Sequence, residues 1–96
     1  MQMPTPKEVL TEALRLIKKG WTKGAMYDPD TDCYCAAGAL QAAAGPYGMA
    51  ELLARDILKE VIKKHCSGIG IVTFNDDPRT TKGKVIAVFK EAIDLA

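Results

Sequence analysis

The residues best suited to bind a small charged molecule lie close together near the C-terminus. Three cations and two hydroxyl side chains occur there: Arg79, Thr80, Thr81, Lys82 and Lys84. They fall at the start of a predicted last helix, where the helix dipole disfavours positive charge. A bound phosphate would reconcile this placement, because backbone amides, hydroxyls and basic side chains all bind phosphate oxygens. The alternative is that Asp76 and Asp77 neutralise the cations at a solvated surface.

A second group that could contact a nucleotide lies in a short loop between Gly20 and Gly24. Trp21 offers a flat aromatic face and Lys23 a mobile cation, which are the two features that nucleotide binding requires. Tyr47, in a Gly-Pro-Tyr-Gly turn, could supply another aromatic face. The alternative interpretation is that Trp21 anchors its loop in the core.

The other reactive side chains do not form a convincing catalytic or metal-binding set. Four residues are of types that bind zinc: Cys33, Cys35, His65 and Cys66. However, a single residue between the first two cysteines is fewer than structural zinc pairs usually have. His65 would have to meet Cys35 in space to activate it, whereas the end of a helix already explains a basic residue at that position. We therefore predict no catalytic residue, no metal and no cofactor.

The spacing of three aspartates matches the first carboxylate ligands of a calcium-binding loop: Asp28, Asp30 and Asp32. Cys33 stands where that loop needs a glycine, and Ala39 stands where it needs a bidentate glutamate. We therefore interpret the segment as a solvated turn, with Asp32 as the N-cap of the next helix.

Two helices are predicted in the N-terminal half. The first begins at the capping box Thr5-Pro6-Lys7-Glu8 and ends at Gly20. The second covers residues 33–44, in which most side chains are small. Gly38 in its interior weakens the helix, so a close backbone contact is expected there in compensation.

Two more helices are predicted in the C-terminal half, one from about residue 49 to 66 and one capped by Thr80 or Thr81. The first carries an apolar stripe of Leu52, Leu53, Ile57, Leu58, Val61 and Ile62. Between the helices, residues 69–74 could form a short strand or a buried extended segment, and 75–78 a turn. We therefore expect an all-α, compact four-helix domain, in which residues 69–74 could form one short extended segment.

Length and composition limit the class of protein. The chain has 96 residues, of which 48% are hydrophobic and 26% charged, so residues 1–96 are expected to form one globular domain. A formal net charge of +1 gives no general attraction to nucleic acids or anionic membranes. Three free cysteines favour a reducing, cytoplasmic location. So small a chain buries a limited share of its surface, which favours a homo-oligomer.

Three motifs, in this order, resemble those of a family of small bacterial and phage proteins: GWTKGA at 20–25, CxCAAGAL at 33–40 and FND at 74–76. The resemblance covers nearly the whole chain and implies no particular reaction. Asn75 and Asp76 of the last motif lie next to the cationic cluster, and we add them to the candidate ligand contacts.

These patterns lead to a hypothesis of ligand capture without catalysis. The protein would be a phage-type anti-defence protein that sequesters a nucleotide-derived, anionic immune signal in the host cytosol. The alternative is a protein-protein interaction module that inhibits or regulates a host protein through its small-residue helix and apolar stripes. An enzyme acting on a nucleotide would need Asp76, Asp77 or His65 for acid-base work.

Overall fold

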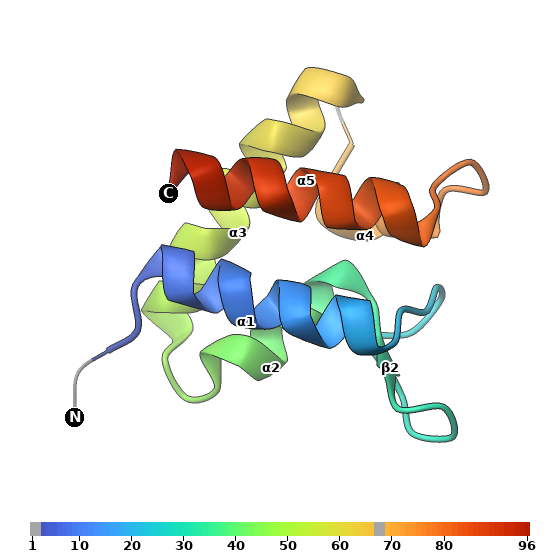
Figure 1. The fold of residues 1–96 in the computed structure, drawn as a ribbon, viewed down its shortest axis with the longest axis horizontal. Helices are drawn as coiled ribbons and strands as arrows, with labels where there is room; N and C mark the ends of the chain where they lie inside the picture. The colour runs from blue at the N-terminus through green and yellow to red at the C-terminus, as the bar shows by residue number, and fades with distance from the viewer. Residues whose placement is uncertain (1–2, 67–68) are drawn as a thin grey trace.

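The computed structural model describes residues 3–66 and 69–96. In chain order these form α1 (Pro6–Lys19), β1 (Tyr27–Asp28), β2 (Cys33–Tyr34), α2 (Ala36–Ala44), α3 (Gly48–His65), α4 (Ile71–Asp76) and α5 (Lys82–Leu95). Figure 1 shows α1 and α5 side by side, with α3 crossing behind both. The molecule is a thin slab that measures 40 × 33 × 17 Å. The expectation of a mostly helical domain is confirmed, but these ranges contain five helices and a two-stranded sheet rather than four helices alone.

The start of α1 forms as its sequence predicts. The Thr5 hydroxyl accepts a hydrogen bond from the Glu8 amide (3.1 Å), and the Glu8 carboxylate accepts one from the Thr5 amide (3.0 Å). Two of the amides that lack a partner within the helix are thus satisfied locally. The inner face buries Val9, Leu10, Ala13, Leu14 and Ile17.

The second helix begins later than predicted, because a short sheet takes its first residues. The Cys35 amide donates to the Met26 carbonyl and the Tyr34 amide donates to the Gly20 carbonyl, which holds this segment extended. Cys35 is therefore the N-cap of α2, and its Sγ accepts from the Gly38 amide (3.3 Å). The prediction of Asp32 as N-cap is wrong.

The close backbone contact predicted at Gly38 is confirmed. A Cβ atom at this position would lie 1.9 Å from the Met26 carbonyl oxygen. The absence of a side chain therefore lets α2 pack directly onto the segment that leads into β1.

Residues 69–74 contain neither a strand nor a wholly extended segment, since α4 begins at Ile71. Ile71, Phe74 and Asn75 are buried, at the i, i+3 and i+4 spacing of one helical face. Burial of this face favours a short helix over a strand, which would turn neighbouring side chains to opposite sides. Asn75 and Asp76 belong to α4, so the prediction of a turn that begins at Asn75 is also wrong.

The bounds of α3 agree with the prediction, but its apolar stripe is only partly inside the core. Leu58, Val61 and Ile62 are buried as expected. Leu52 and Leu53 are 54% and 43% exposed, while the small residues Ala50 and Ala54 face the core instead. No helix among the described residues has the length and apolar character needed to cross a membrane.

Candidate functional site

A groove of about 420 Å³ lies where the end of α3, α4 and the start of α5 meet. Its polar wall consists of Asp77, Arg79, Thr80 and Lys84. Ile69 and Phe74 supply an apolar part, and His65 and Cys66 lie at the α3 end. This volume is within the usual range for small-molecule sites. The structure thus brings three of the sequence-predicted anion contacts, Arg79, Thr80 and Lys84, to one concave surface.

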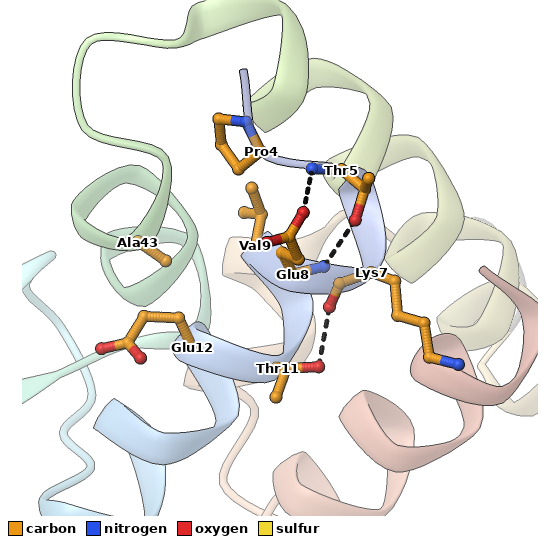
Figure 2. Close-up of a pocket in the computed structure, with 8 residues that line it drawn as sticks. All are labelled: Pro4, Thr5, Lys7, Glu8, Val9, Thr11, Glu12 and Ala43. Carbon is orange, nitrogen blue, oxygen red and sulfur yellow. Dashed lines mark hydrogen bonds between the residues drawn. The ribbon is translucent and has the colours of Figure 1, made fainter. Parts of the chain in front are cut away.

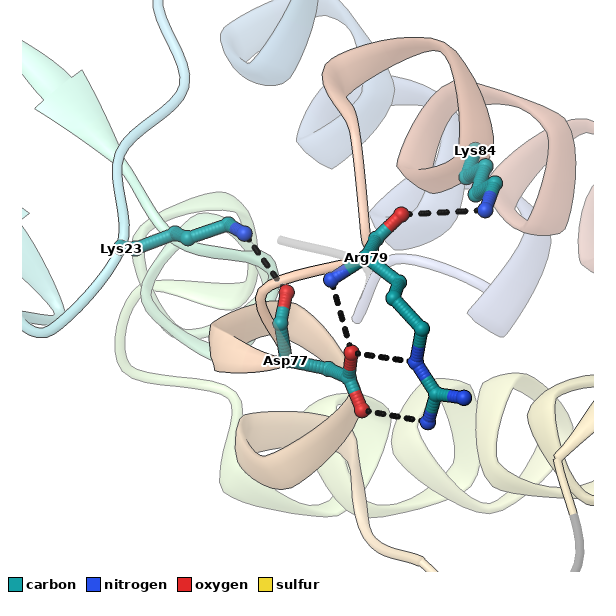
Figure 3. Close-up of polar contacts among 4 residues, drawn as sticks. All are labelled: Lys23, Asp77, Arg79 and Lys84. Atoms are coloured by element: carbon teal, nitrogen blue, oxygen red, sulfur yellow. Dashed lines mark hydrogen bonds and ion pairs between the residues drawn. The ribbon is translucent and has the colours of Figure 1, made fainter.

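Asp77 organises the loop that precedes α5, as Figure 3 shows. Its carboxylate accepts from the Arg79 amide (2.8 Å) and from the Arg79 guanidinium at two positions (both 3.2 Å). The Arg79 side chain, followed by the Arg79 amide, lowers the pKa of Asp77 to about 2. Asp77 thus pairs with Arg79, as the alternative interpretation expected for this cation. The Arg79 side chain nevertheless remains 88% exposed.

Lys84 has a different environment. Its ammonium group donates to the Arg79 carbonyl oxygen (3.0 Å), and no ion pair joins it to a carboxylate of the described residues. A carbonyl dipole holds the ammonium in place without cancelling its charge. Lys84 is thus a positioned and uncompensated cation in the groove wall.

The two threonines at the start of α5 have separate roles. The Thr81 hydroxyl accepts from the Lys84 amide (3.3 Å) and caps the helix, as one of the two predicted options. Thr80 is buried and lines the groove. Lys82 lies outside the groove and donates to the Lys18 carbonyl (2.9 Å) at the end of α1, where the helix dipole favours a cation.

Asn75 joins the motif segments through its buried side chain. Its Oδ1 accepts from Trp21 Nε1 (2.7 Å) and from the Ala36 amide (2.9 Å). Its Nδ2 donates to the Thr22 carbonyl and to Asp76 Oδ1 (both 3.0 Å). Trp21 therefore anchors its loop to the body of the protein, which was the alternative interpretation of this residue. The sequence placed Asn75 among ligand contacts, whereas its polar atoms bond within the protein.

Lys23 and Asp76 belong, with Trp21 and Asn75, to one cluster of contacts that anchors the Trp21 loop. Asp76 Oδ1 accepts from the Gly24 amide (3.0 Å), and the hydrogen bond from Asn75 followed by this amide lowers the pKa of Asp76. Lys23 donates to the Asp77 carbonyl (2.6 Å), and its nitrogen lies 5.5 Å from the centroid of the Trp21 ring. Figure 3 shows Lys23 reaching Asp77 from the side opposite Arg79. The cluster thus supports the groove loop and does not line the groove.

Tyr47 lies far from this groove. It immediately precedes Gly48, the first residue of α3, whereas the groove contains His65, the last. A helix of 18 residues is about 27 Å long. Tyr47 is partly buried against the core.

Cys33 and Cys35 lie away from His65 and Cys66, which line the groove. The Cys35 sulfur lies at the start of α2, 3.8 Å from Met26 Sδ, and Cys33 contacts the Thr31 carbonyl. His65 bonds to Glu91 rather than to a thiol. In the ranges that the structure describes, no cluster of three or more histidine, cysteine, aspartate or glutamate side chains could hold a metal ion.

A larger hollow, of about 570 Å³, lies over the first turns of α1 beside α2 (Figure 2). Most of its polar side chains have partners close by in the chain: Thr5 and Glu8 form the capping box, and the Thr11 hydroxyl donates to the Lys7 carbonyl (2.7 Å). Glu12 pairs with Arg15. This hollow therefore offers less recognition chemistry than the groove beside α5.

Nearly the whole chain matches a protein family. Residues 1–95 match the family DUF6197, described as a family of unknown function. No curated protein and no solved structure matches the chain. The resemblance inferred from the motifs is thus confirmed at the level of a family of unknown function, and a role must be argued from the groove.

Proposed function

This chain belongs to the DUF6197 family, and we propose that it is a non-catalytic protein that captures a small, phosphate-bearing, nucleotide-derived ligand in the groove beside α5. The observation that carries the proposal is the Lys84 ammonium, which lines the groove and is bound only to a carbonyl among the described residues. An anion there would supply the missing negative charge.

Arg79 and Thr80 add to this anion site. The Asp77 carboxylate occupies the Nε and Nη2 atoms of Arg79, which leaves further guanidinium donors for a second acceptor. Thr80 adds a hydroxyl, and Phe74 an apolar surface for the uncharged part of a ligand. In this proposal the ligand is an immune signal of the host cell, and a phage-type protein withholds it by binding alone.

Thermal unfolding of the purified protein with inorganic phosphate, pyrophosphate, nucleotides and cyclic nucleotides tests the proposal. A ligand at 100 times its dissociation constant stabilises the native state by about 2.7 kcal/mol, which raises Tm measurably. Lys84→Ala is expected to abolish the shift, whereas Lys90→Ala, on an exposed part of α5, should retain it. No shift with any of these compounds would refute the proposal, and a chemically altered ligand after release would refute capture without catalysis.

A second candidate, a protein-interaction module, is favoured by the outward face of α3. Met49, Leu52 and Leu53 are 59%, 54% and 43% exposed, and their spacing places them on one side of the helix. We propose self-association through this face. Analytical ultracentrifugation should then give a mass above that of a monomer, and Leu52→Lys with Leu53→Lys should reduce it to the monomer mass. A monomeric wild-type protein at high micromolar concentration would contradict this candidate.

A further inference from the structure

A second hollow lies beside the groove, farther along α5. It measures about 370 Å³ and shares His65, Cys66, Phe74 and Lys84 with the first, so the two hollows adjoin. It adds Ala87, Val88 and Glu91. Together the two hollows form one extended groove with a cationic end near Arg79 and a carboxylate at the other end.

The lining of this extension follows one stripe of α5. Lys84, Ala87, Val88 and Glu91 are spaced at i, i+3, i+4 and i+7, which places them on the same helical face. Glu91 lies seven positions beyond Lys84, a rise of about 10 Å along the helix axis, which is comparable to the span from the phosphate of a nucleoside monophosphate to the far edge of its base. A phosphate at Lys84 would place the base against Ala87 and Val88 and its edge near Glu91.

The Glu91 carboxylate is held in a fixed orientation. Its Oε2 accepts from Lys64 Nζ (2.6 Å), and its Oε1 bonds to His65 Nε2 (3.0 Å). The hydrogen bond from Lys64, followed by that from His65, lowers the pKa of Glu91, so the group is an ionised acceptor at neutral pH. An ionised carboxylate has about four acceptor positions. With one neighbour on each oxygen, each oxygen keeps a free position that can accept from a ligand.

From this arrangement we propose that the extended groove selects guanine among the nucleobases, with Glu91 as the specificity-determining residue. Guanine presents two adjacent N–H donors, at N1 and N2, which match the two oxygens of one carboxylate. Adenine and cytosine present an amino group beside a ring nitrogen acceptor, and that acceptor would face the carboxylate unfavourably. Uracil and thymine present a single N–H between two carbonyl oxygens. The inference rests on the proposed function, because the phosphate at Lys84 sets the position of the base.

Titration calorimetry with GMP and AMP, and NMR titration with inorganic phosphate, test this inference. The wild-type protein should bind GMP about tenfold or more tightly than AMP, because a well-formed bidentate contact to a base gives this order of discrimination. Glu91→Gln should remove the preference, because the amide replaces one acceptor by a donor. Its phosphate titration, which reports the Lys84 end of the groove, should still show binding.

A second variant separates base recognition from any effect of Glu91 on the fold. Ala87 is exposed and lines the extension, so Ala87→Trp should fill this part of the groove without disturbing the core. It should weaken GMP binding about tenfold or more and leave phosphate binding intact, while Lys90→Trp should affect neither. Equal affinity for GMP and AMP, or a preference that survives in Glu91→Gln, overturns the guanine assignment while the anion site stands. Failure of phosphate and of both nucleotides to bind overturns the proposed function itself.

Discussion

At the scale of single residues, the candidate ligand contacts divide into two groups. Trp21 and Asn75 bond to each other inside the protein, whereas Arg79 and Lys84 line a groove. Asn75 is fully buried, yet its side-chain oxygen and nitrogen each make two hydrogen bonds. A buried polar group with complete partners specifies one arrangement of the chain, because any other arrangement would leave these groups unsatisfied.

Asn75→Ala is expected to lower the free energy of unfolding by about 2 to 4 kcal/mol, because it leaves a cavity and removes the partner of a buried amide. Urea denaturation followed by circular dichroism measures this loss. Asp76→Asn is the matched control: it keeps an acceptor oxygen at an exposed position and should cost less than about 1 kcal/mol. Equal losses in the two variants would contradict the role assigned to Asn75.

Asp77 should make stability depend on pH at the acidic end. Its pKa in the folded protein is about 2, below the ordinary value of 3.8, because Arg79 stabilises the ionised form. Its contribution is therefore present above about pH 4 and is lost as the pH falls through about 2. Wild-type Tm should decrease more steeply over this interval than the Tm of Asp77→Asn. Parallel pH profiles would show that the pair with Arg79 does not stabilise the fold.

At the scale of elements, packing decides where helices begin and which side chains they expose. The short sheet delays the start of α2, and its N-cap becomes Cys35. In the first turns of α3 the alanines face inward, and Leu52 and Leu53 of the predicted apolar stripe face outward. Periodicity shows that a helix is amphipathic, but neighbouring elements determine how closely each part of it can approach.

Gly38→Ala should destabilise the protein by about 1 to 3 kcal/mol, although alanine favours helices by up to about 1 kcal/mol relative to glycine. The reason is that the added Cβ would overlap the Met26 carbonyl oxygen at 1.9 Å, so the backbone must shift. Gly83→Ala in α5 is the matched control, because its Cβ would meet only Thr81 Oγ1, at 3.8 Å. That variant should be neutral or more stable in urea denaturation. A stabilised Gly38→Ala protein would contradict the close contact between α2 and the segment before β1.

At the scale of the whole molecule, a slab 17 Å thick leaves much of each helix near solvent. The core is formed where α1, α2, α3 and α5 pack together, and the β1–β2 hairpin projects away from it (Figure 1). The groove lies at the edge of this core, where the ends of α3 and α4 meet the start of α5. Rigid helices can thus hold groove residues that come from three separate segments.

Hydrogen exchange should follow this division of the molecule. Amides at the exposed hairpin tip, residues 30–32, should exchange early, because little apolar surface must open to release them. Amides of Leu40 and Phe89, which are fully buried, should exchange last. Exchange measured by NMR or mass spectrometry gives this order, and a protected hairpin tip would show a further contact there, such as one between two copies of the chain.

Features that depend on residues a few positions apart could be predicted from the sequence. These are the capping box at Thr5, a threonine cap for α5, the ends of α3, and the gathering of Arg79, Thr80 and Lys84. For Gly38 the sequence predicted a close contact but not its partner, Met26, which lies twelve positions away. Caps and helical stripes involve side chains within about four positions of each other, so their energetics are local.

The fold was needed to show that residues 71–76 form a helix, that Asn75 bonds to Trp21, and that Tyr47 lies away from the groove. The Asn75 contacts join it to residues 54 and 39 positions away in the chain. The fold determines whether a polar side chain lies beside a distant backbone group or at a surface open to a ligand. A side chain that the fold buries loses its hydrogen bonds to water, so it must form hydrogen bonds within the protein instead. Local sequence patterns carry no information about such distant partners. The residues that anchor the Trp21 loop therefore could not be distinguished from the residues that line the groove before the fold was known.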